Sequence, residues 1–525
     1  MSANRIVTVQ EMREIEAASV RLGVSLDDLQ RNAAAAVARE VVRLFSVPSG
    51  PAVFLVGPGN NGRDTLIAAR ILLEEGWPIR VYLAPKVDSE DLLHGLQGGG
   101  AAILAHGQDG DIDVLKQWVS GARVVVDGLL GIGIRGPARE PIARIIAAAN
   151  EVAAARRVAV VSVDLPSGID ADTGDVPGEA IRARYTVSLG CVKAGLLRFP
   201  AAEYVGTLLP VEIGLPPATY QSVQLELLEA DGVVDLIPRR PLGAHKGSFG
   251  RVLVVGGSRR FVGAPFLAGA AAARVGCGLV TLAVPEWQRA PLAALLPEAT
   301  FLPLLGADDE ESADADAQSI LEELPDCDAL AIGPGLGQTP ASSRLVLAVL
   351  EGNRGGPRLP AVIDADALNV LAREKEWWVT IGPGQVLTPH PGEMSRLTGL
   401  GMEEIERDRW RVASSAAIRW EQVVVLKGAL TVIAEPGGRI WVSPFANPAL
   451  ATGGTGDVLS GMIAGMLSQG AQPADAARAG VYLHGSVAEM VLEDHGVDRL
   501  LAGDLLPMIP GTIRRMTGQR GATAG

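Results

Sequence analysis

A glycine-rich stretch that leads into an apolar run carries the clearest chemical signal in the sequence. Residues 452–457 have the sequence T-G-G-T-G-D, and residues 458–467 are almost all apolar, which predicts a tight turn followed by a buried helix. Glycines let the backbone approach an anion, and the unpaired N–H groups of a first helical turn favour negative charge. Asp457 would lie at this helix start, where a carboxylate can take a proton from a substrate hydroxyl. Taken alone, a helix cap is the commoner role for such an aspartate.

Four further motifs favour the catalytic interpretation of Asp457, because each one follows or ends a short apolar run. Their sequences are D-A-L-A-I-G-P-G-L-G at 328–337, A-V-I-D-A-D-A-L-N at 361–369, L-T-P-H-P-G-E at 387–393 and L-K-G-A at 426–429. The carboxyl ends of parallel strands meet at one edge of a sheet, where ligands collect. We therefore predict a phosphoryl-transfer site built from all five motifs.

The elements that must position these motifs are short buried strands alternating with alanine-rich helices. Strands are predicted at 53–56, 79–83, 124–126, 158–163, 251–255, 279–284, 329–332, 361–363, 386–387 and 423–426. Such alternation is typical of a parallel, three-layer α/β sheet. The rhythm starts again near residue 238, and 525 residues exceed one ordinary domain. We predict two α/β/α domains, residues 1–225 and 226–518, without a long flexible linker.

Composition excludes several classes of function. A net charge of −14 argues against a general nucleic-acid binder. Three widely separated cysteines indicate a reducing compartment and give no case for a disulfide framework or a zinc site. The N-terminus has no signal-peptide core, and the most apolar stretch, 261–284, holds Arg274 and two glycines, so it predicts a helix and a strand rather than a membrane span. We expect a cytoplasmic protein with neither membrane nor nucleic acid as partner.

The order of motifs in the second half closely resembles the ribokinase-like superfamily and, within it, the ADP/ATP-dependent NAD(P)H-hydrate dehydratases. The discriminating motifs are H-K-G at 245–247, G-P-G-L-G at 333–337, T-P-H-P-G-E at 388–393 and N-P-A-L-A at 447–451. The resemblance covers residues 238–515. One departure is Ala449-Leu450, where the family usually has Gly-Met.

This resemblance implies the roles of individual residues. The S hydrate of the nicotinamide nucleotide would contact Ala264, Gly335, Gly337, His390 and Asp457. The adenine nucleotide would be held by Lys427, Gly428, Ala429, Leu430, Thr431 and Gly456. Asp457 would deprotonate the C6 hydroxyl of the hydrate, and loss of the phosphate formed there would restore the reduced nicotinamide. ADP, or ATP, would donate the phosphoryl group, with Mg²⁺ offsetting its charge. On spacing alone, His390 between two prolines could equally be a structural turn residue.

The motifs of the first half resemble the NAD(P)H-hydrate epimerase family, over residues 5–218. They are G-P-G-N-N-G-R-D at 57–64, V-D-G-L-L-G-I-G at 126–133 and V-D-L-P-S-G-I-D at 163–170. The resemblance implies a Rossmann-like domain whose substrate contacts are Asn60, Asn61, Gly62, Arg63, Asp64, Gly131, Ile132, Gly133, Ile134, Arg135, Gly136, Pro137 and Asp164. K⁺ would be bound through oxygen atoms of Asn61, Asp127 and Ser167. Asp127 is the expected acid/base residue, with Lys193 as a second candidate.

Two positions in the first motif depart from the family pattern. The family usually has G-N-N-G-G-D-G, whereas Arg63 and Thr65 replace glycines here. Arg63 could bind a phosphate, or it could fill the space that a ligand needs if its φ is positive. Residues 29–33 and 193–196 also depart, with L-Q-R-N-A and K-A-G-L. These changes are compatible with the fold. They also allow an alternative, in which the first domain is a binding or oligomerisation module that has lost catalysis.

The leading hypothesis is a fused, homo-oligomeric enzyme that repairs hydrated NADH and NADPH (NADHX and NADPHX). One domain would interconvert R and S hydrates, and the other would dehydrate the S hydrate. ADP is preferred to ATP as donor only by analogy with fused bacterial relatives. The alternative is a small-alcohol kinase of the same superfamily that releases a stable phosphorylated alcohol. The His-Pro motif at His390 argues against that alternative.

Overall fold

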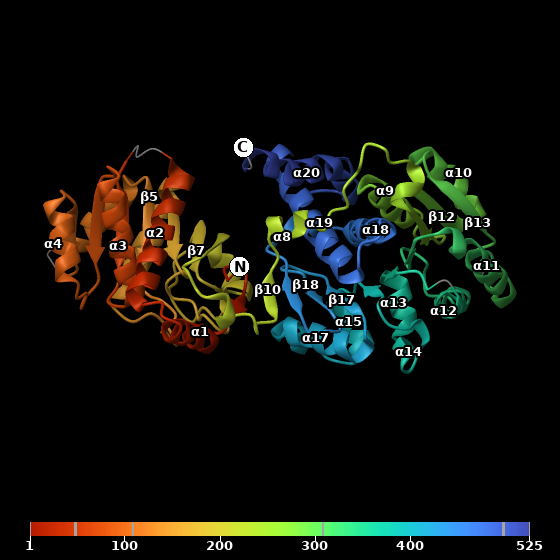
Figure 1. Cartoon of the computed structure of the whole chain (residues 1–525), viewed down its shortest axis with the longest axis horizontal. Helices are drawn as coiled ribbons and strands as arrows, with labels where there is room; N and C mark the ends of the chain where they lie inside the picture. The colour runs from red at the N-terminus through yellow and green to blue at the C-terminus, as the bar shows by residue number, and fades with distance from the viewer. Residues whose placement is uncertain are drawn as a thin grey trace. The chain divides into compact units, whose positions relative to one another are not determined.

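The computed structural model describes residues 2–46, 50–107, 110–306, 309–356, 358–495 and 499–523. The chain divides into two compact units, Met1–Leu227 and Leu228–Gly525. In each unit, helices cover both faces of a central, mostly parallel sheet (Figure 1). The predicted α/β class with two three-layer units is therefore confirmed.

The sheet of the first unit has the strand order β4-β3-β2-β5-β6-β7-β9, and all its pairs are parallel. Its strands are β2 (Ala52–Val56), β3 (Ile79–Leu83), β4 (Ala102–Ala105), β5 (Val124–Gly128), β6 (Ala159–Val163), β7 (Tyr185–Leu189) and β9 (Thr207–Val211). The chain moves outward in one direction from β2 and then resumes at β5 on its other side. The carboxyl ends of β2 and β5 therefore form a switch point, where ligands bind in such sheets.

Two apolar layers hold the helices of this unit against the sheet. Alternate strand residues face opposite layers, so Phe54 and Val126 pack with α2 and α3, whereas Val53 and Val125 pack with α5 and α6. The helices are α1 (Val9–Arg21), α2 (Leu26–Phe45), α3 (Asn60–Glu74), α4 (Glu90–Gly98), α5 (Asp111–Ser120), α6 (Ile142–Arg156) and α7 (Ala202–Val205). A short parallel pair joins β1 (Ile6–Val7) to β8 (Val192–Lys193).

The sheet of the second unit runs β19-β18-β17-β16-β15-β14-β11-β12-β13. Pairing is parallel from β17 to β13 and antiparallel from β17 to β19. Its strands are β11 (Arg251–Val255), β12 (Leu279–Pro285), β13 (Thr300–Leu304), β14 (Ala329–Ile332), β15 (Ala361–Ile363), β16 (Val386–Leu387), β17 (Val423–Leu426), β18 (Val432–Ala434) and β19 (Ile440–Val442). The switch point of this sheet lies between β11 and β14.

One face of this second sheet packs against α9, α18, α19 and α20, and the other against α11 to α17. The helices are α8 (Ala230–Val234), α9 (Ala264–Arg274), α10 (Glu286–Leu295), α11 (Glu310–Glu323), α12 (Pro340–Gly355), α13 (Ala365–Leu371), α14 (Trp377–Ile381), α15 (Pro391–Thr398), α16 (Met402–Arg407), α17 (Arg409–Trp420), α18 (Thr455–Ser468), α19 (Pro473–His495) and α20 (Ala502–Thr523). Small residues on α18 allow close packing on α9, because a Cβ on Gly461 would lie 2.0 Å from the carbonyl oxygen of Ala268.

The structure differs from the sequence prediction at the first glycine-rich motif. The glycines and asparagines of residues 57–62 favour a turn, and helical spacing in the sequence begins only at Thr65, but α3 already begins at Asn60. Arg63 is therefore a helical residue and does not have positive φ. Its side chain is exposed and its Nε donates to Gln30 at 3.1 Å. The backbone consequently tolerates Arg63 without strain.

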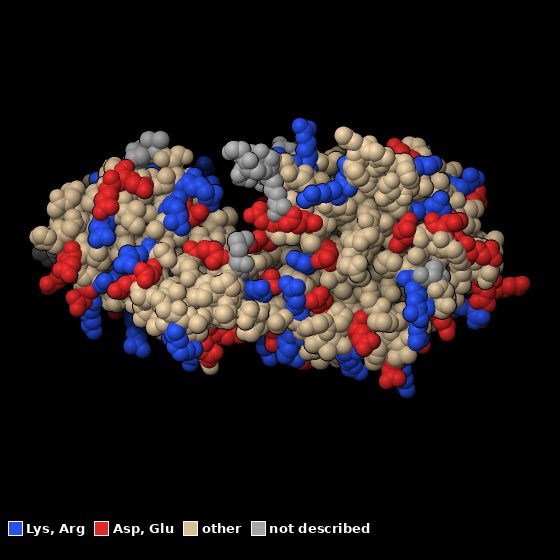
Figure 2. Space-filling model, viewed as in Figure 1, with Lys and Arg blue, Asp and Glu red and all other residues tan. Residues whose placement is uncertain are grey.

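Two surface properties bear on the class of protein. Within the described ranges, no helix combines the length and apolarity that a membrane crossing requires. On the face shown in Figure 2, basic and acidic side chains are interspersed over both units rather than gathered by sign.

Candidate active sites

The loop before α18 is held together by its own hydroxyl groups. Thr455 Oγ1 donates to the carbonyl oxygens of Leu450 at 2.8 Å and Thr452 at 2.9 Å, and Thr452 Oγ1 donates to that of Ala449 at 3.0 Å. Gly454 makes the turn into the helix at φ 95°, a left-handed conformation that favours glycine. The loop thus places Asp457 in the first turn of α18, as predicted.

A buried ion pair lies beside this helix start. Lys427 Nζ is 2.7 Å from Asp364 Oδ1 and 3.8 Å from Glu393 Oε2. The second oxygen of Asp364 accepts a hydrogen bond of 2.5 Å from Ser460, which lies one turn after Asp457 on α18. The ends of β15, β16 and β17 and the start of α18 therefore converge on one charged cluster.

The electrostatics of the cluster give Asp457 the pKa of a base that works near neutrality. Burial raises the pKa of Asp457 to about 7, Asp364 adds to this rise, and Lys427 opposes it. Burial and Asp364 likewise raise the pKa of Glu393 to about 7 against the effect of Lys427. Burial disfavours charge on Lys427, but Asp364 and Glu393 outweigh it and raise the pKa of the ammonium. A general base is most effective when its pKa lies near the working pH.

His390 caps α15 with its ring. Its Nδ1 accepts a hydrogen bond of 3.0 Å from the Gly392 N–H, and the backbone N–H of His390 donates to Glu393 Oε2 at 2.8 Å. Burial lowers the pKa of His390, and the charges of Lys427 and Arg396 lower it further. The ring is therefore neutral at pH 7, with its proton on Nε2 and half of the side chain exposed.

The residues predicted to bind the adenine nucleotide form one loop beside the helix start. Gly428 and Ala429 are exposed, and Leu430 has φ 55°, a strained conformation for a leucine. Thr431 Oγ1 closes the loop by donating to Gly428 O at 2.8 Å. Gly456 lies close to this loop, since a Cβ on it would be 3.4 Å from Lys427 Nζ.

The remaining residues predicted to contact the hydrate lie at the start of α9 and after β14, which neighbours β15 on the side away from β17. Ala264 begins α9, and a Cβ on Gly335 would lie 3.0 Å from the Ala264 Cβ. Gly337 donates its N–H to Asp366 Oδ2 at 2.8 Å. The structure thus places two groups of predicted ligands on either side of the carboxylate cluster.

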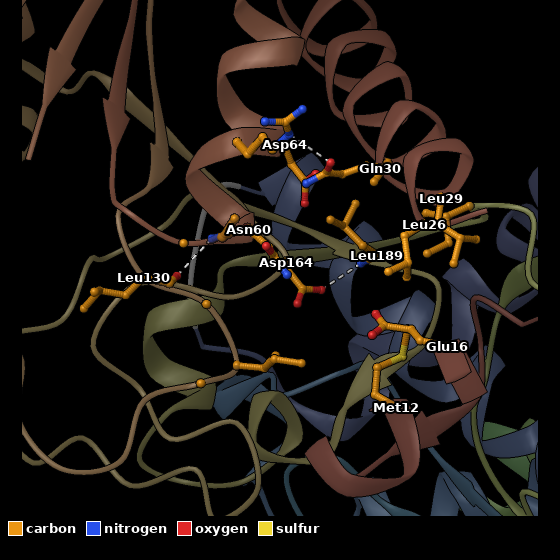
Figure 3. Close-up of a pocket in the computed structure, with 18 of the residues that line it drawn as sticks. Met12, Glu16, Leu26, Leu29, Gln30, Asn60, Asp64, Leu130, Asp164 and Leu189 are labelled. Carbon is orange, nitrogen blue, oxygen red and sulfur yellow. Dashed lines mark hydrogen bonds between the residues drawn. The ribbon is translucent and has the colours of Figure 1, made fainter. Parts of the chain in front are cut away.

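In the first unit, a cavity of about 710 Å³ opens at the carboxyl ends of β2, β5 and β6. Figure 3 shows Asp164 in its wall, with Asp64 and Gln30 on one side and Glu16 on the other. The predicted residues that line it are Asn60, Asn61, Arg63, Asp64, Gly131, Ile132, Gly133, Ile134 and Asp164. Arg135 lines an adjoining cavity of about 250 Å³. Gly62, Gly136 and Pro137 are not among the lining residues of either cavity.

Asp164 and Lys193 form the charged centre of this cavity. Lys193 Nζ is 2.5 Å from Asp164 Oδ1 and also donates to the carbonyl oxygens of Leu189 and Cys191. Asp164 has φ 67°, a conformation that non-glycine residues seldom adopt outside special sites. Lys193 is almost fully buried, so its ammonium depends on these partners.

Asp127, our first candidate for acid/base chemistry, is placed differently from expectation. It is fully buried and does not line the cavity. Its carboxylate accepts hydrogen bonds from Ser162 Oγ, Ser167 Oγ and the backbone N–H groups of Ser167 and Leu129. Burial raises the pKa of Asp127, although these hydrogen bonds oppose the rise. This geometry suits a carboxylate that holds the segments around Leu129 and Ser167 in place rather than one that contacts the substrate.

The lining of this cavity includes two acidic residues with a raised pKa: Asp64 of α3, which was predicted only as a substrate contact, and Glu16 of α1, which was not predicted. Burial raises the pKa of Asp64 to about 8, Asp164 adds to the rise, and one oxygen of Asp64 has no hydrogen-bond partner among the described residues. Burial also raises the pKa of Glu16. No local signal marks Glu16, because α1 has an ordinary amphipathic pattern. Ser460 was missed as well, although its spacing from Asp457 places both on one face of α18.

The second departure from the epimerase pattern is also accommodated. Thr65 is fully buried, and its hydroxyl donates to Asn61 O at 2.7 Å. It occupies the space over Gly128, where a Cβ would lie 1.9 Å from Thr65 Oγ1. Neither Thr65 nor Arg63 blocks the cavity.

Comparison with known proteins agrees with this architecture. Residues 252–511 match the family described as NAD(P)H-hydrate dehydratase, and residues 26–195 match the family described as YjeF-related protein N-terminus. The chain is 38% identical to a bifunctional NAD(P)H-hydrate repair enzyme of Moorella thermoacetica, covering 97% of each chain. It is 36% identical to that of Escherichia coli, covering 94% of this chain and 90% of the relative.

Among solved structures, the chain is similar to an ADP/ATP-dependent NAD(P)H-hydrate dehydratase from Bacillus subtilis that was co-crystallised with ATP and Mg²⁺. The identity is 36%, the coverage is 55% of this chain and 97% of that chain, and the TM-score is 0.48. The full-length relatives decide the assignment: the chain belongs to the family of bifunctional NAD(P)H-hydrate repair enzymes.

Proposed function

We propose that the chain repairs hydrated NADH and NADPH in two steps, epimerisation of R and S hydrates in the first unit and nucleotide-dependent dehydration of the S hydrate in the second. The observation that carries the second step is Asp457. Its carboxyl lies in the first turn of α18, next to the Lys427–Asp364 pair, with a pKa of about 7. The small-alcohol kinase alternative is not favoured, because full-length relatives with both units are repair enzymes.

In the proposed reaction, Asp457 accepts the proton of the C6 hydroxyl while the hydroxyl oxygen attacks the terminal phosphoryl group of the donor. The donor loses that phosphoryl group, and the hydrate becomes a phosphate ester. Phosphate then leaves from C6 as a proton is lost from C5, which restores the double bond of the reduced nicotinamide. Hydrate contacts are assigned to Ala264, Gly335, Gly337 and the neutral ring of His390.

The phosphoryl donor is assigned to the loop of residues 427–431 and Gly456. The N–H groups at the start of α18 and the Lys427 ammonium favour the charge that develops on the phosphoryl group. We prefer ADP to ATP as donor. Parallel assays of the S hydrate with each nucleotide decide between them by the rate at which reduced-nicotinamide absorbance returns.

A divalent cation fits this site only in company with the nucleotide. Among the described residues, no cluster of three or more His, Cys, Asp or Glu side chains could enclose a metal ion. Mg²⁺ in phosphoryl-transfer sites is held mainly by phosphate oxygens and water, with one or two carboxylates. Glu393, in the carboxylate cluster beside the donor loop, is the carboxylate we assign to this role. When bound, Mg²⁺ would offset the negative charge of the donor phosphates.

For the epimerase step, we propose that Asp164 and Lys193 hold and move the proton, with Asp64 as a further proton carrier. All three line the same cavity, whereas Asp127 does not. This proposal reverses our order of preference between Asp127 and Lys193. The test is the conversion of pure R hydrate into S hydrate, coupled to dehydration in the same protein.

The oxygen atoms around Asp127 fit a monovalent cation. Asn61 Nδ2 and Ser167 Oγ both donate to the carbonyl oxygen of Leu130, and Ser167 Oγ also donates to Asp127, so the oxygen atoms of these residues lie close together. Among the described residues, Asp127 has only uncharged donors as partners, so a cation would offset its buried charge. We assign K⁺ to Asn61, Asp127 and Ser167. Epimerisation should therefore be faster in KCl than in choline chloride, and Asp127→Asn should remove that difference.

A further inference from the structure

The Leu228–Gly525 unit has a cavity of about 500 Å³, which extends beyond the residues assigned to the reaction. It is bounded by the segments that follow β11, β12, β13 and β14, at the switch point of the sheet. It includes Gly337, assigned to the hydrate, and Asp366, which fixes Gly337 through a hydrogen bond of 2.8 Å. The cavity is therefore continuous with the proposed hydrate site.

Two large aromatic side chains are exposed at this cavity. Trp287, near the start of α10, is 47% exposed, and Phe261, before α9, is 44% exposed. Both line the cavity. Exposed aromatic surface at a concave site indicates a binding function, and the face of an aromatic ring is a platform for a flat base.

Two buried polar atoms beside the cavity have no hydrogen-bond partner among the described residues. Gln288 is fully buried, and its Nε2 donates to Ser258 O at 2.9 Å, but its Oε1 has no hydrogen-bond partner in the described part of the chain. The same is true of Ser258 Oγ, on a residue that lines the cavity. Ser258 therefore has an unsatisfied hydroxyl beside the cavity, whereas Gln288 lies behind the lining residues and holds the Ser258 backbone.

The cavity presents two exposed guanidinium groups, while its two carboxylates are held by uncharged donors of the protein. Arg259 and Arg260 line it and are exposed, and within the described ranges no carboxylate forms an ion pair with either one. The Arg260 guanidinium lies 5.5 Å from the centre of the Phe261 ring, so a base stacked on Phe261 would take the face that Arg260 leaves open or displace Arg260. Both carboxylates of the lining already accept hydrogen bonds, Asp316 from two backbone N–H groups and Asp366 from Gly337 and Gln338. Unpaired guanidinium groups favour phosphate.

We propose that this cavity binds the adenylyl half of the hydrated dinucleotide, with the purine against Trp287 and Phe261 and the phosphates near Arg259 and Arg260. This inference rests on the proposed dehydratase function. The phosphoryl donor is assigned to the loop after β17, whereas the cavity lies at β11 to β13, on the opposite side of β15 and its Asp364. From β15 to β12 there are three strand spacings, about 14 Å, a span that an extended dinucleotide crosses.

The test compares two substrates in the intact protein: the S hydrate of NADH and the S hydrate of reduced nicotinamide mononucleotide, which lacks the adenylyl half. The variants are Trp287→Ala and the double change Arg259→Ala with Arg260→Ala. The matched control is Arg289→Ala, because Arg289 lies on the same helix as Trp287, pairs with Glu286 and does not line the cavity.

Each cavity variant should lower kcat/KM for the complete hydrate by about 10-fold, the scale of one lost base–aromatic contact, and change the mononucleotide hydrate by less than about twofold. The control should leave both substrates unchanged. Equal losses on both substrates, or no loss on the complete hydrate, would overturn the inference while leaving the dehydratase function intact. Failure of the unaltered protein on both hydrates would instead overturn the proposed function, and this inference with it.

Discussion

Lys427 and Asp364 form an ion pair of 2.7 Å at the centre of the second unit, and the same ammonium restrains the pKa of Asp457. Asp364 is nearly inaccessible to solvent, so its charge depends on Lys427 and on the Ser460 hydroxyl. The ion pair therefore affects both the stability of the second unit and the pKa of its proposed base.

Lys427→Met should destabilise the second unit by about 3–5 kcal/mol, because it leaves a buried carboxylate without its partner. It should also abolish dehydration, since Asp457 would lose a charge that favours its ionised form. Urea unfolding followed by circular dichroism measures the first effect. Lys375→Met is the matched control, because Lys375 is exposed and should change stability by less than about 0.5 kcal/mol. Equal unfolding midpoints for the two variants would contradict this account of the pair.

The pH dependence of dehydration should report the ionisation of Asp457. Because the base must be deprotonated, kcat/KM for the S hydrate should rise with pH to about 7 and level off above it. Glu393 has a similar pKa, so Glu393→Gln serves to separate the two groups. If the inflection disappears in Glu393→Gln while activity persists, Asp457 is not the base.

The raised pKa of Asp457 also affects the stability of the fold. Its ionisation destabilises the folded state, whereas ionisation of a typical paired aspartate stabilises it. The folded-state pKa of Asp457 is raised above the value of 3.8, so the folded state binds the proton more tightly than the unfolded state. Ionisation then costs stability as pH rises from about 4 to about 7. Asp457→Asn should consequently raise Tm at pH 8 and have a smaller effect at pH 4. A lower Tm at pH 8 would show that burial does not destabilise the ionised carboxylate of Asp457.

Lys193→Met should impair epimerisation without affecting dehydration. The variant removes the ammonium from Asp164 in the cavity of the first unit, and loss of a proton-transferring group typically costs about 10²-fold or more. The measurement starts from pure R hydrate and from pure S hydrate in separate reactions. Lys116→Met, at an exposed lysine of the same unit, is the control. Comparable R-hydrate turnover in both variants would exclude Lys193 from the reaction.

Arg63 should behave as an ordinary helical residue. Arg63→Gly restores the family residue but places glycine inside α3, which should cost about 1 kcal/mol, whereas Arg63→Ala should not. Thermal unfolding of the two variants makes the comparison, with Arg70→Gly on the same helix as the reference. Stabilisation by Arg63→Gly would show that the arginine is strained after all.

Local patterns in the sequence predict most strands of this protein to within a residue or two. The six strands predicted from 251–255 to 423–426 are short and mostly apolar, four of them lie between glycine, proline or aspartate residues, and the structure confirms all six with one boundary extended by a residue. Strands β4, β7, β9, β13, β18 and β19 were not predicted. The predicted start of α3 was wrong, because Gly59, Asn60 and Asn61 are typical of a turn, whereas Asn60 and Asn61 form the first turn of the helix. The family and its two units are confirmed by the full-length relatives.

The charged interiors of the two sites could not be predicted in the same way. The pKa of Asp457 depends on burial and on Asp364, which lies 93 residues away in the chain. Glu16 lies on a helix at the start of the chain, and the charge of Lys193 acts on its pKa because the fold brings these distant residues together. The preference for Asp127 over Lys193 followed from a motif, whereas the burial that argues against it is a tertiary property.

The central claim is that Asp457 is the base of a nucleotide-dependent dehydratase. The most direct test is to incubate the pure S hydrate of NADH with ADP or ATP and Mg²⁺, and to follow the return of reduced-nicotinamide absorbance in the unaltered protein and in Asp457→Asn. The account predicts full recovery with the unaltered protein and loss of turnover in Asp457→Asn, with nucleotide binding retained. Undiminished turnover in Asp457→Asn, or accumulation of a phosphorylated product without reduced nicotinamide, would contradict it.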